Sequence, residues 1–128
     1  MATQRPACRR RASFGPGTDD DTESVGLKAA GGYAEATQAD CIGLDSIVPL
    51  SWAANTIQHR LGRCIQGNLD PMMLVAGGQP MATEVDRILR EAGQGPFIFN
   101  LGHGLEKTTP SEHVADLVGQ VKAWRPKL

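Results

Sequence analysis

The sequence has few aromatic residues, no excess of charge of one sign, no long hydrophobic run and no paired cysteine motif. Only 5% of the 128 residues are aromatic, and 13 basic residues stand against 14 acidic ones. The formal net charge of -1 argues against a nucleic-acid-binding surface and against a role at a membrane surface. No apolar run approaches the roughly 20 residues that a membrane-spanning helix needs. The length suits a single domain.

The three cysteines, Cys8, Cys41 and Cys64, are odd in number and far apart in the sequence. Because there is no C-x-x-C pair, the pattern indicates neither a zinc ribbon nor a disulfide framework. Cys41 and Cys64 lie in short apolar runs, so we expect small buried thiols in a reducing compartment. This usage predicts a cytoplasmic protein.

Residues 1–32 differ in composition from the rest of the chain. The first 18 residues contain four arginines and no acid, and an acidic cluster follows directly. The segment has almost no apolar periodicity, so burial cannot offset the entropy of ordering it, and we predict a disordered tail. An Arg-rich start also fits an organellar targeting peptide, although no amphipathic stripe accompanies it.

From Tyr33 onward, short apolar runs alternate three times with longer segments of helical period. The runs cover residues 40–45, 63–68 and 96–101, and the helical patterns cover 50–61, 83–92 and 110–121. Strands this short and this uniformly apolar are typical of parallel sheets covered by helices. Residues 33–128 are therefore predicted to form an α/β domain of three βα units.

The last helical pattern begins with a capping sequence, because Thr109 and Glu112 have the spacing of a capping box and Pro110 suits the first helical position. His59 and His113 fall within helical segments near charged residues, and we expect both to be surface side chains.

The domain allows roughly 32 residues to each unit, whereas an eight-unit barrel takes about 250 in total. Three units can form a small open sheet or the last part of a larger barrel. An open wedge of three strands would leave two apolar sheet edges unpaired.

Polar residues follow each predicted strand at its carboxyl end, where parallel α/β proteins place their reactive groups. They are Asp45 after the first strand, Asn68 and Asp70 after the second, and Asn100 and His103 after the third. The two glycines that flank His103 let a ligand approach it closely, and an imidazole there can bind a carboxylate or move protons near neutral pH. A loop role without a ligand is equally compatible with the residues.

Other roles for these side chains stay open. Asp70 precedes Pro71 and can cap the next segment, and Asp45 can open its own loop. One imidazole with two carboxylates suits several divalent ions, but the spacing specifies no metal site, and we expect none.

Three stretches resemble the uroporphyrinogen decarboxylase family, in the family's own order. They are Ala39–Asp45 (ADCIGLD), Gln66–Pro71 (QGNLDP) and Phe97–Gly104 (FIFNLGHG), the last followed by Thr109-Pro110 and Glu112-His113-Val114. The resemblance covers roughly residues 33–124 and is absent from 1–32.

The resemblance implies a TIM (β/α)8 barrel of which this chain holds the last three βα units, strands 6–8. The family's enzymes are carboxy-lyases of porphyrin and haem biosynthesis that act without metal or cofactor. They convert uroporphyrinogen III to coproporphyrinogen III with loss of four CO2. The substrate itself accepts the electrons, because a protonated pyrrole ring becomes an iminium-like cation as each carboxylate leaves. The family also implies a homodimer.

By the same resemblance, His103 corresponds to a histidine of the substrate cleft, and we expect Asn68, Asp70, Asp45 and Asn100 to bind substrate at its rim. The family's amino-terminal arginines and pyrrole-binding aspartate belong to earlier units that residues 33–128 do not include. We therefore expect little or no decarboxylation by this chain alone. Alternatives are a non-catalytic binding or assembly fragment and, less favoured, a zinc- and corrinoid-dependent methyltransferase of the same superfamily.

Overall fold

The computed structural model describes residues 11–14, 36 and 38–126. Its strands are β1 (Arg11–Phe14), β2 (Cys41–Leu44), β3 (Cys64–Leu69) and β4 (Phe97–Leu101). Its helices are α2 (Leu50–Ala53), the π-helix η1 (Ala54–Arg60), α3 (Pro71–Ala76), α4 (Gly78–Ala92) and α5 (Ser111–Ala123). The three predicted apolar runs are confirmed as strands, each within one or two residues of the expected bounds.

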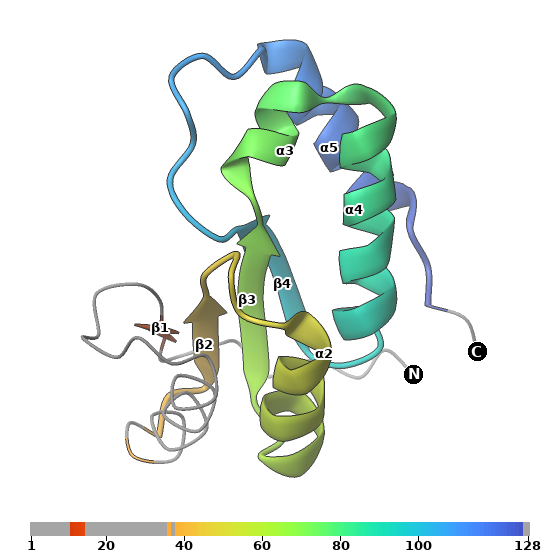
Figure 1. The fold of residues 1–128 in the computed structure, drawn as a ribbon. Coiled ribbons are helices and arrows are strands. Elements are labelled where there is room, and N and C mark those ends of the chain that lie inside the picture. The colour runs from red at the N-terminus through yellow and green to blue at the C-terminus, as the bar shows by residue number, and fades with distance from the viewer. Residues whose placement is uncertain (1–10, 15–35, 37, 127–128) are drawn as a thin grey trace.

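The strands form one parallel sheet in the order β1-β2-β3-β4 (Figure 1). Ile65 is in register with Ile42 on one side and with Phe97 on the other. Strands β2, β3 and β4 are therefore neighbours in space in chain order, and helices lie between β2 and β3 and between β3 and β4 along the chain. The predicted α/β class with parallel strands is confirmed.

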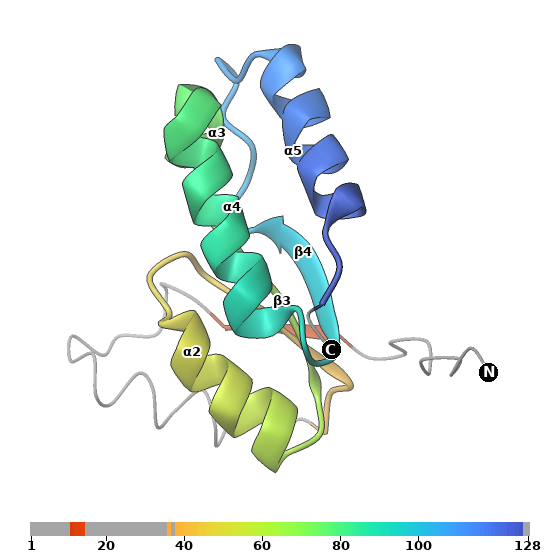
Figure 2. The same ribbon diagram turned by 90° about the vertical axis from the view of Figure 1, so that its right-hand side faces the viewer.

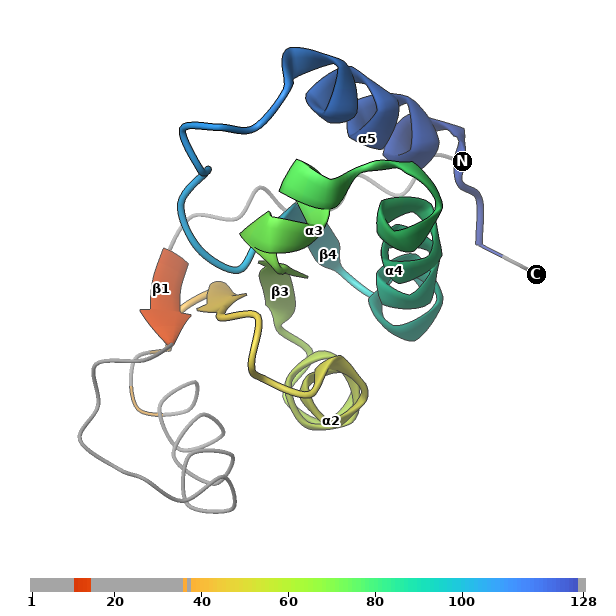
Figure 3. The ribbon, with the colours of Figure 1, turned by 45° about the horizontal axis from the view of Figure 1, so that its top comes forward.

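The hydrophobic core lies between one face of this sheet and the helices. Its sheet side chains include Ile42, Leu44, Ile65 and Leu69, and the helices add others such as Ile88. Helices α2 and α4 lie on the same side of the sheet (Figure 3), and α5 packs beside α4 (Figure 2). Covering one face with helices is the arrangement of a barrel segment, and the fold is consistent with part of a TIM barrel.

The helices differ in detail from the predicted patterns. The first is short and continues as a π-helix, and α4 begins at Gly78 instead of residue 83 because Met81 also reaches the core. The segment after Asp70, for which the sequence analysis predicts no helix, forms helix α3 with Pro71 at its start. Proline is favoured there because the first helical turn does not use its missing N–H.

Part of the amino-terminal segment forms a strand that the sequence analysis does not predict. Strand β1 pairs in parallel with β2, with Arg11 in register with Cys41. One of the two sheet edges expected to be unpaired is thus covered by the chain itself. The remaining residues of the 1–32 tail lie outside the described part of the chain.

The predicted capping box at the start of α5 is wrong. Helix α5 begins at Ser111 with Pro110 as its N-cap and no side-chain cap hydrogen bond. The hydroxyl of Thr109 is buried and has no hydrogen-bond partner among the described residues. Proline in the cap position has extended backbone geometry, and this shifts the helix start by one residue relative to the capping-box register.

No helix in the described part of the chain is long and apolar enough to cross a membrane.

Candidate functional site

The loops that follow β2, β3 and β4 meet at one end of the sheet. The amide of Gly102 donates to the carbonyl of Leu69 at 2.8 Å, which ties the loop after β4 to the end of β3. A Cβ built on Gly102 would lie 2.3 Å from the backbone nitrogen of Ser46, in the loop after β2. Only glycine can approach a backbone so closely. Gly102 therefore lets the loop after β4 contact the loop after β2 across the end of β3. We call this end of the sheet the rim.

Asn68 holds the loop after β2 in place. Its side-chain amide donates to the carbonyls of Asp45 at 3.0 Å and of Val48 at 2.8 Å, and only 3% of the residue is exposed. The carboxylate of Asp45 accepts from the amide of Ile47 at 3.2 Å and is also buried. Both residues lie at the rim, as predicted, and both shape its loops. The side-chain oxygen of Asn68 is buried without a hydrogen-bond partner among the described residues.

Asp70 and Asn100 lie at the same end and are exposed. The carboxylate of Asp70 caps α3 by accepting from the amide of Met72 at 2.9 Å. Asn100 is in register with Asn68 on the neighbouring strand, and its side-chain oxygen accepts from the amide of Leu101 at 2.8 Å. The carboxamide nitrogen of Asn100 has no hydrogen-bond partner among the described residues.

His103 follows Gly102 directly, so the contact with Ser46 fixes it at the same end of the sheet as Asp45 and Asn68. The residue is exposed, and its ring makes no hydrogen bond to the described residues. An exposed imidazole at this place can donate to a carboxylate or exchange a proton with a bound molecule.

The prediction that His113 is a plain surface residue is wrong, whereas His59 is exposed as expected. The Nδ1 atom of His113 lies 2.8 Å from the carbonyl oxygen of Leu74, and the ring is half-buried. A Cβ at Gly77 would lie within 2.6 Å of three of its ring atoms, so the α3–α4 junction needs glycine to accept the ring. His113 thereby fastens α5 to this junction. In the sequence, the only feature that could have indicated this contact is the glycine at position 77, which leaves room for the ring of His113.

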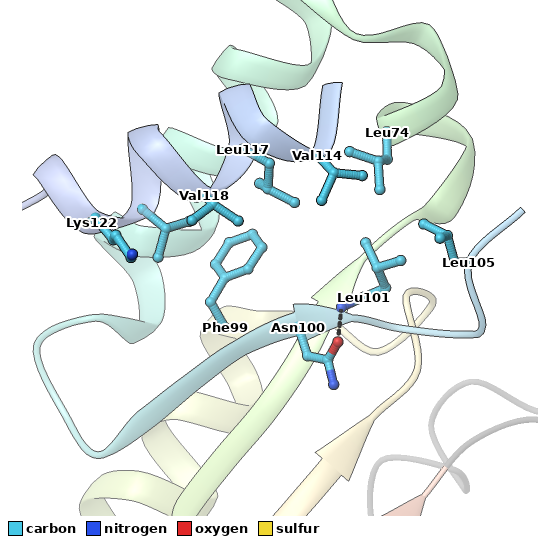
Figure 4. A pocket seen from close by; sticks show the side chains of 10 residues that line it. Leu74, Phe99, Asn100, Leu101, Leu105, Val114, Leu117, Val118 and Lys122 are labelled. Atoms are coloured by element: carbon cyan, nitrogen blue, oxygen red, sulfur yellow. Dashed lines mark hydrogen bonds between the residues drawn. The ribbon is translucent and has the colours of Figure 1, made fainter. Parts of the chain in front are cut away.

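An apolar cavity of about 370 Å³ lies between β4 and α5, away from most of the rim residues (Figure 4). Phe99 points from β4 towards Leu117 and Val118 of α5, Leu101 points towards Val114 and Leu74, and Lys122 lies at one end. The sequence analysis did not predict it, because it depends on how far α5 stands from the sheet. Asn100 is the one predicted site residue that also lines it.

Charge at the rim comes from few groups. Within the described residues, no three His, Cys, Asp or Glu side chains are placed to hold a metal ion. The strongest ionic cluster lies elsewhere, on the outer surface of α4, where Arg87 pairs with Glu84 and Glu91. Hydrogen bonding from Arg87 lowers the pKa of Glu84, and the same bond raises the pKa of Arg87.

Comparison with known proteins identifies the family. The family model described as "Uroporphyrinogen decarboxylase (URO-D)" matches residues 26–124. The match begins before Tyr33, the start of the resemblance that the sequence motifs carry.

Relatives named uroporphyrinogen decarboxylase support the same assignment. The protein of Rhodospirillum rubrum is 50% identical over 93 residues, which are 73% of this chain and 26% of the relative. That of Paracoccus denitrificans is 44% identical over 91 residues (71% and 26%), and that of Sphingopyxis alaskensis is 46% identical over 107 residues (80% and 31%). The chain spans between a quarter and a third of the length of these relatives. It belongs to the uroporphyrinogen decarboxylase family.

Proposed function

We propose that this chain forms the last three βα units, strands 6–8, of a uroporphyrinogen decarboxylase barrel and that its rim is part of the cleft in which the tetrapyrrole substrate loses CO2. The observation that carries the proposal is the contact between the loops after β2, β3 and β4 through Gly102 and Ser46. Family membership and the sequential order of parallel strands support it. In barrel enzymes the cleft is built from the loops at this end of the strands.

His103 and Asn100 are the proposed direct contacts with substrate. Both are exposed at the rim, and their ring nitrogens and carboxamide N–H groups can hydrogen-bond to the acetate and propionate carboxylates of uroporphyrinogen. Asn68, Asp45 and Asp70 serve substrate binding through the loops that they hold: Asn68 and Asp45 fix the loop after β2, and Asp70 fixes the start of α3. An error of about 1 Å in such loops is enough to reduce catalysis strongly.

A chimera tests this proposal. Residues 33–124 replace the matching segment of the Rhodospirillum rubrum relative, and decarboxylation is followed anaerobically by chromatography of the porphyrins. We expect coproporphyrinogen from the chimera, and about a 10²-fold lower rate after His103→Ala, a loss typical of a positioned acid–base or binding group. Glu106→Ala, in the same loop and exposed, is the matched control and should keep the activity. A folded chimera that produces no coproporphyrinogen contradicts the proposal.

The isolated 128-residue chain is proposed to lack decarboxylase activity. The residues that hold the pyrrole N–H groups are expected in earlier units of the barrel, and the exposed polar side chains among the predicted residues of the described rim are Asp70, Asn100 and His103. Coproporphyrinogen formed by this chain alone in the same anaerobic assay would overturn this part. Homodimer formation and a cytoplasmic location are proposed as well, and neither a nucleic acid nor a membrane is a proposed partner. Size-exclusion chromatography with light scattering tests the dimer.

A second candidate, a non-catalytic binding or assembly fragment, is favoured by the apolar cavity between β4 and α5 (Figure 4). Fluorescence titration of the chain with oxidised uroporphyrin separates the two functions. Binding that weakens after His103→Ala supports a retained substrate cleft. Binding that does not depend on His103 supports the assembly role.

A further inference from the structure

The register of the sheet places two cysteines side by side at the amino ends of their strands. Cys41 of β2 and Cys64 of β3 are direct partners in the parallel pairing. Partners at one register point to the same face of a sheet, so both thiols lie on one side. Neighbouring strands are about 4.8 Å apart, within the range of about 4.4–6.8 Å that separates the Cα atoms of disulfide-bonded cysteines.

The backbone around this pair is held on both strands. The amide of Cys64 donates to the carbonyl of Asp40 at 3.0 Å, directly beside Cys41. The guanidinium of Arg63 crosses to the carbonyl of Ala39 at 2.6 Å. These two bonds join Cys64 to Asp40 and Arg63 to Ala39, so they hold the beginnings of the two strands together.

The two thiols differ in access. Cys41 is completely buried, although it does not belong to the hydrophobic cluster that contains its neighbour Ile42. Cys64 is half-buried. A partly exposed cysteine in direct register with a fully buried one suits an attacking and a resolving cysteine.

We propose that Cys41 and Cys64 are a reversible thiol modification site, which a low-molecular-weight disulfide such as oxidised glutathione converts to an interstrand disulfide. The thiolate of Cys64 attacks one sulfur of the reagent, a mixed disulfide forms, and one reagent thiolate leaves. Cys41 then loses its proton and attacks the sulfur of Cys64, which releases the second thiolate. The two cysteines are oxidised by two electrons, and one reagent disulfide is reduced to two thiols.

Formation of the disulfide breaks a weak contact of the Cys64 thiol, whose Sγ atom lies 3.6 Å from the carbonyl oxygen of Ile65. Side chains on adjacent parallel strands stand farther apart at Cβ than the mean of about 3.8 Å in disulfides, so the bond is strained. Strained disulfides are readily reduced, which makes this pair a reversible site instead of a structural crosslink.

Intact-mass spectrometry of the purified chain with excess oxidised glutathione tests the proposal. We expect Cys41 and Cys64 to lose two hydrogens and to carry no glutathione, whereas the third thiol, Cys8, can bind one glutathione as a mixed disulfide. Trypsin cleaves after Arg60 and Arg63, so the disulfide joins the peptides 29–60 and 64–87. Excess reduced glutathione should restore both thiols.

Variants assign the two steps. Cys41→Ser should stop the reaction at a mixed disulfide of glutathione with Cys64, and Cys8→Ser is the matched control that leaves the crosslink unchanged. The wild-type measurement stands without any variant, so a poorly folded Cys41→Ser chain does not weaken it. The proposal is wrong if the wild-type chain keeps both thiols, retains glutathione on Cys64, or forms a crosslink that includes Cys8.

Discussion

The two faces of the sheet use the same strands for different purposes. On the helix-covered face, Ile42 and Ile65 are fully buried in the core. On the opposite face, the next residues in register include Gln66 and Asn68 of β3, and Ile98 and Asn100 of β4, so three of these four side chains are polar. The comparison teaches that apolar burial on the helix-covered face supplies stability, whereas the opposite face carries polar side chains, of which Asn68 holds a loop of the rim.

The largest effect should come from removing apolar volume on the covered face. Ile65→Ala leaves a cavity in the core, and we expect a loss of about 2–5 kcal/mol in the free energy of unfolding, measured with urea. Ile98→Ala, on the opposite face of the neighbouring strand and 41% exposed, should cost about 1 kcal/mol or less. Equal losses for the two variants would remove the distinction between the faces.

Gly102→Ala tests whether close approach of the loops builds the rim. The new Cβ would meet the backbone of Ser46, so we expect a loss of about 1–3 kcal/mol and a shift of the loop resonances in NMR spectra. Gly104→Ala, two residues further along, has nothing within 4 Å of the new Cβ and should change stability by less than about 0.5 kcal/mol. If the spectra of Gly102→Ala and of the wild type are similar, the loops after β2 and β4 are not in close contact, and the prediction is wrong.

Asn68 and Asn100 are in register on the face of the sheet that the helices do not cover, but Asn68 is buried and Asn100 is exposed. Asn68→Ala removes donors from the carbonyls of Asp45 and Val48, which then lie unsatisfied in a buried place, and we expect a loss of about 1–3 kcal/mol. Asn100→Ala removes one exposed bond to its own strand and should cost about 0.5 kcal/mol. Denaturation midpoints of the two variants measure the difference; the reverse order would contradict it.

The smallest effect concerns the ion pair outside both faces. Because Arg87 lowers the pKa of Glu84 in the folded chain, this pair stabilises the fold above the pKa of an unfolded glutamate. The stabilisation is lost as the pH falls through the lower pKa of the folded state. At this exposed site we expect about 0.5 kcal/mol between wild type and Glu84→Gln at neutral pH. Urea titrations should show that the difference vanishes in acid; a difference that grows in acid has the wrong sign.

Local patterns predicted the parts of the fold that local physics decides. Short apolar runs predicted β2, β3 and β4, and 3.6-residue periodicity predicted most of α4, because the burial of these elements follows the local order of apolar and polar residues. The sequence also predicted that the loops after these strands lie at one end of the sheet, since parallel strands end together; the substrate-binding role of their side chains stays a prediction. The predicted capping box is absent because Pro110, with extended backbone geometry, occupies the N-cap position that was predicted for Thr109.

Contacts between distant residues could not be predicted in this way. The pairing of β1 with β2, the ring of His113 over Gly77 and the amide of Gln58, which donates to Ala92 and Pro96, each join segments whose spacing in sequence carries no signal. Whether a polar side chain at the rim meets solvent or a backbone carbonyl likewise depends on its neighbours. Asn68 and Asn100 look alike in sequence and differ in burial for this reason.

The sequence by itself determined the βα repeats, the parallel sheet and the family, because periodicity and motif order are properties of neighbouring residues. The tertiary structure alone decided which rim groups are exposed, how α5 stands off β4 to leave a cavity, and that Cys41 lies beside Cys64. The physical reason is register: a shift of a strand by one residue would preserve every local pattern and yet turn each side chain to the other face.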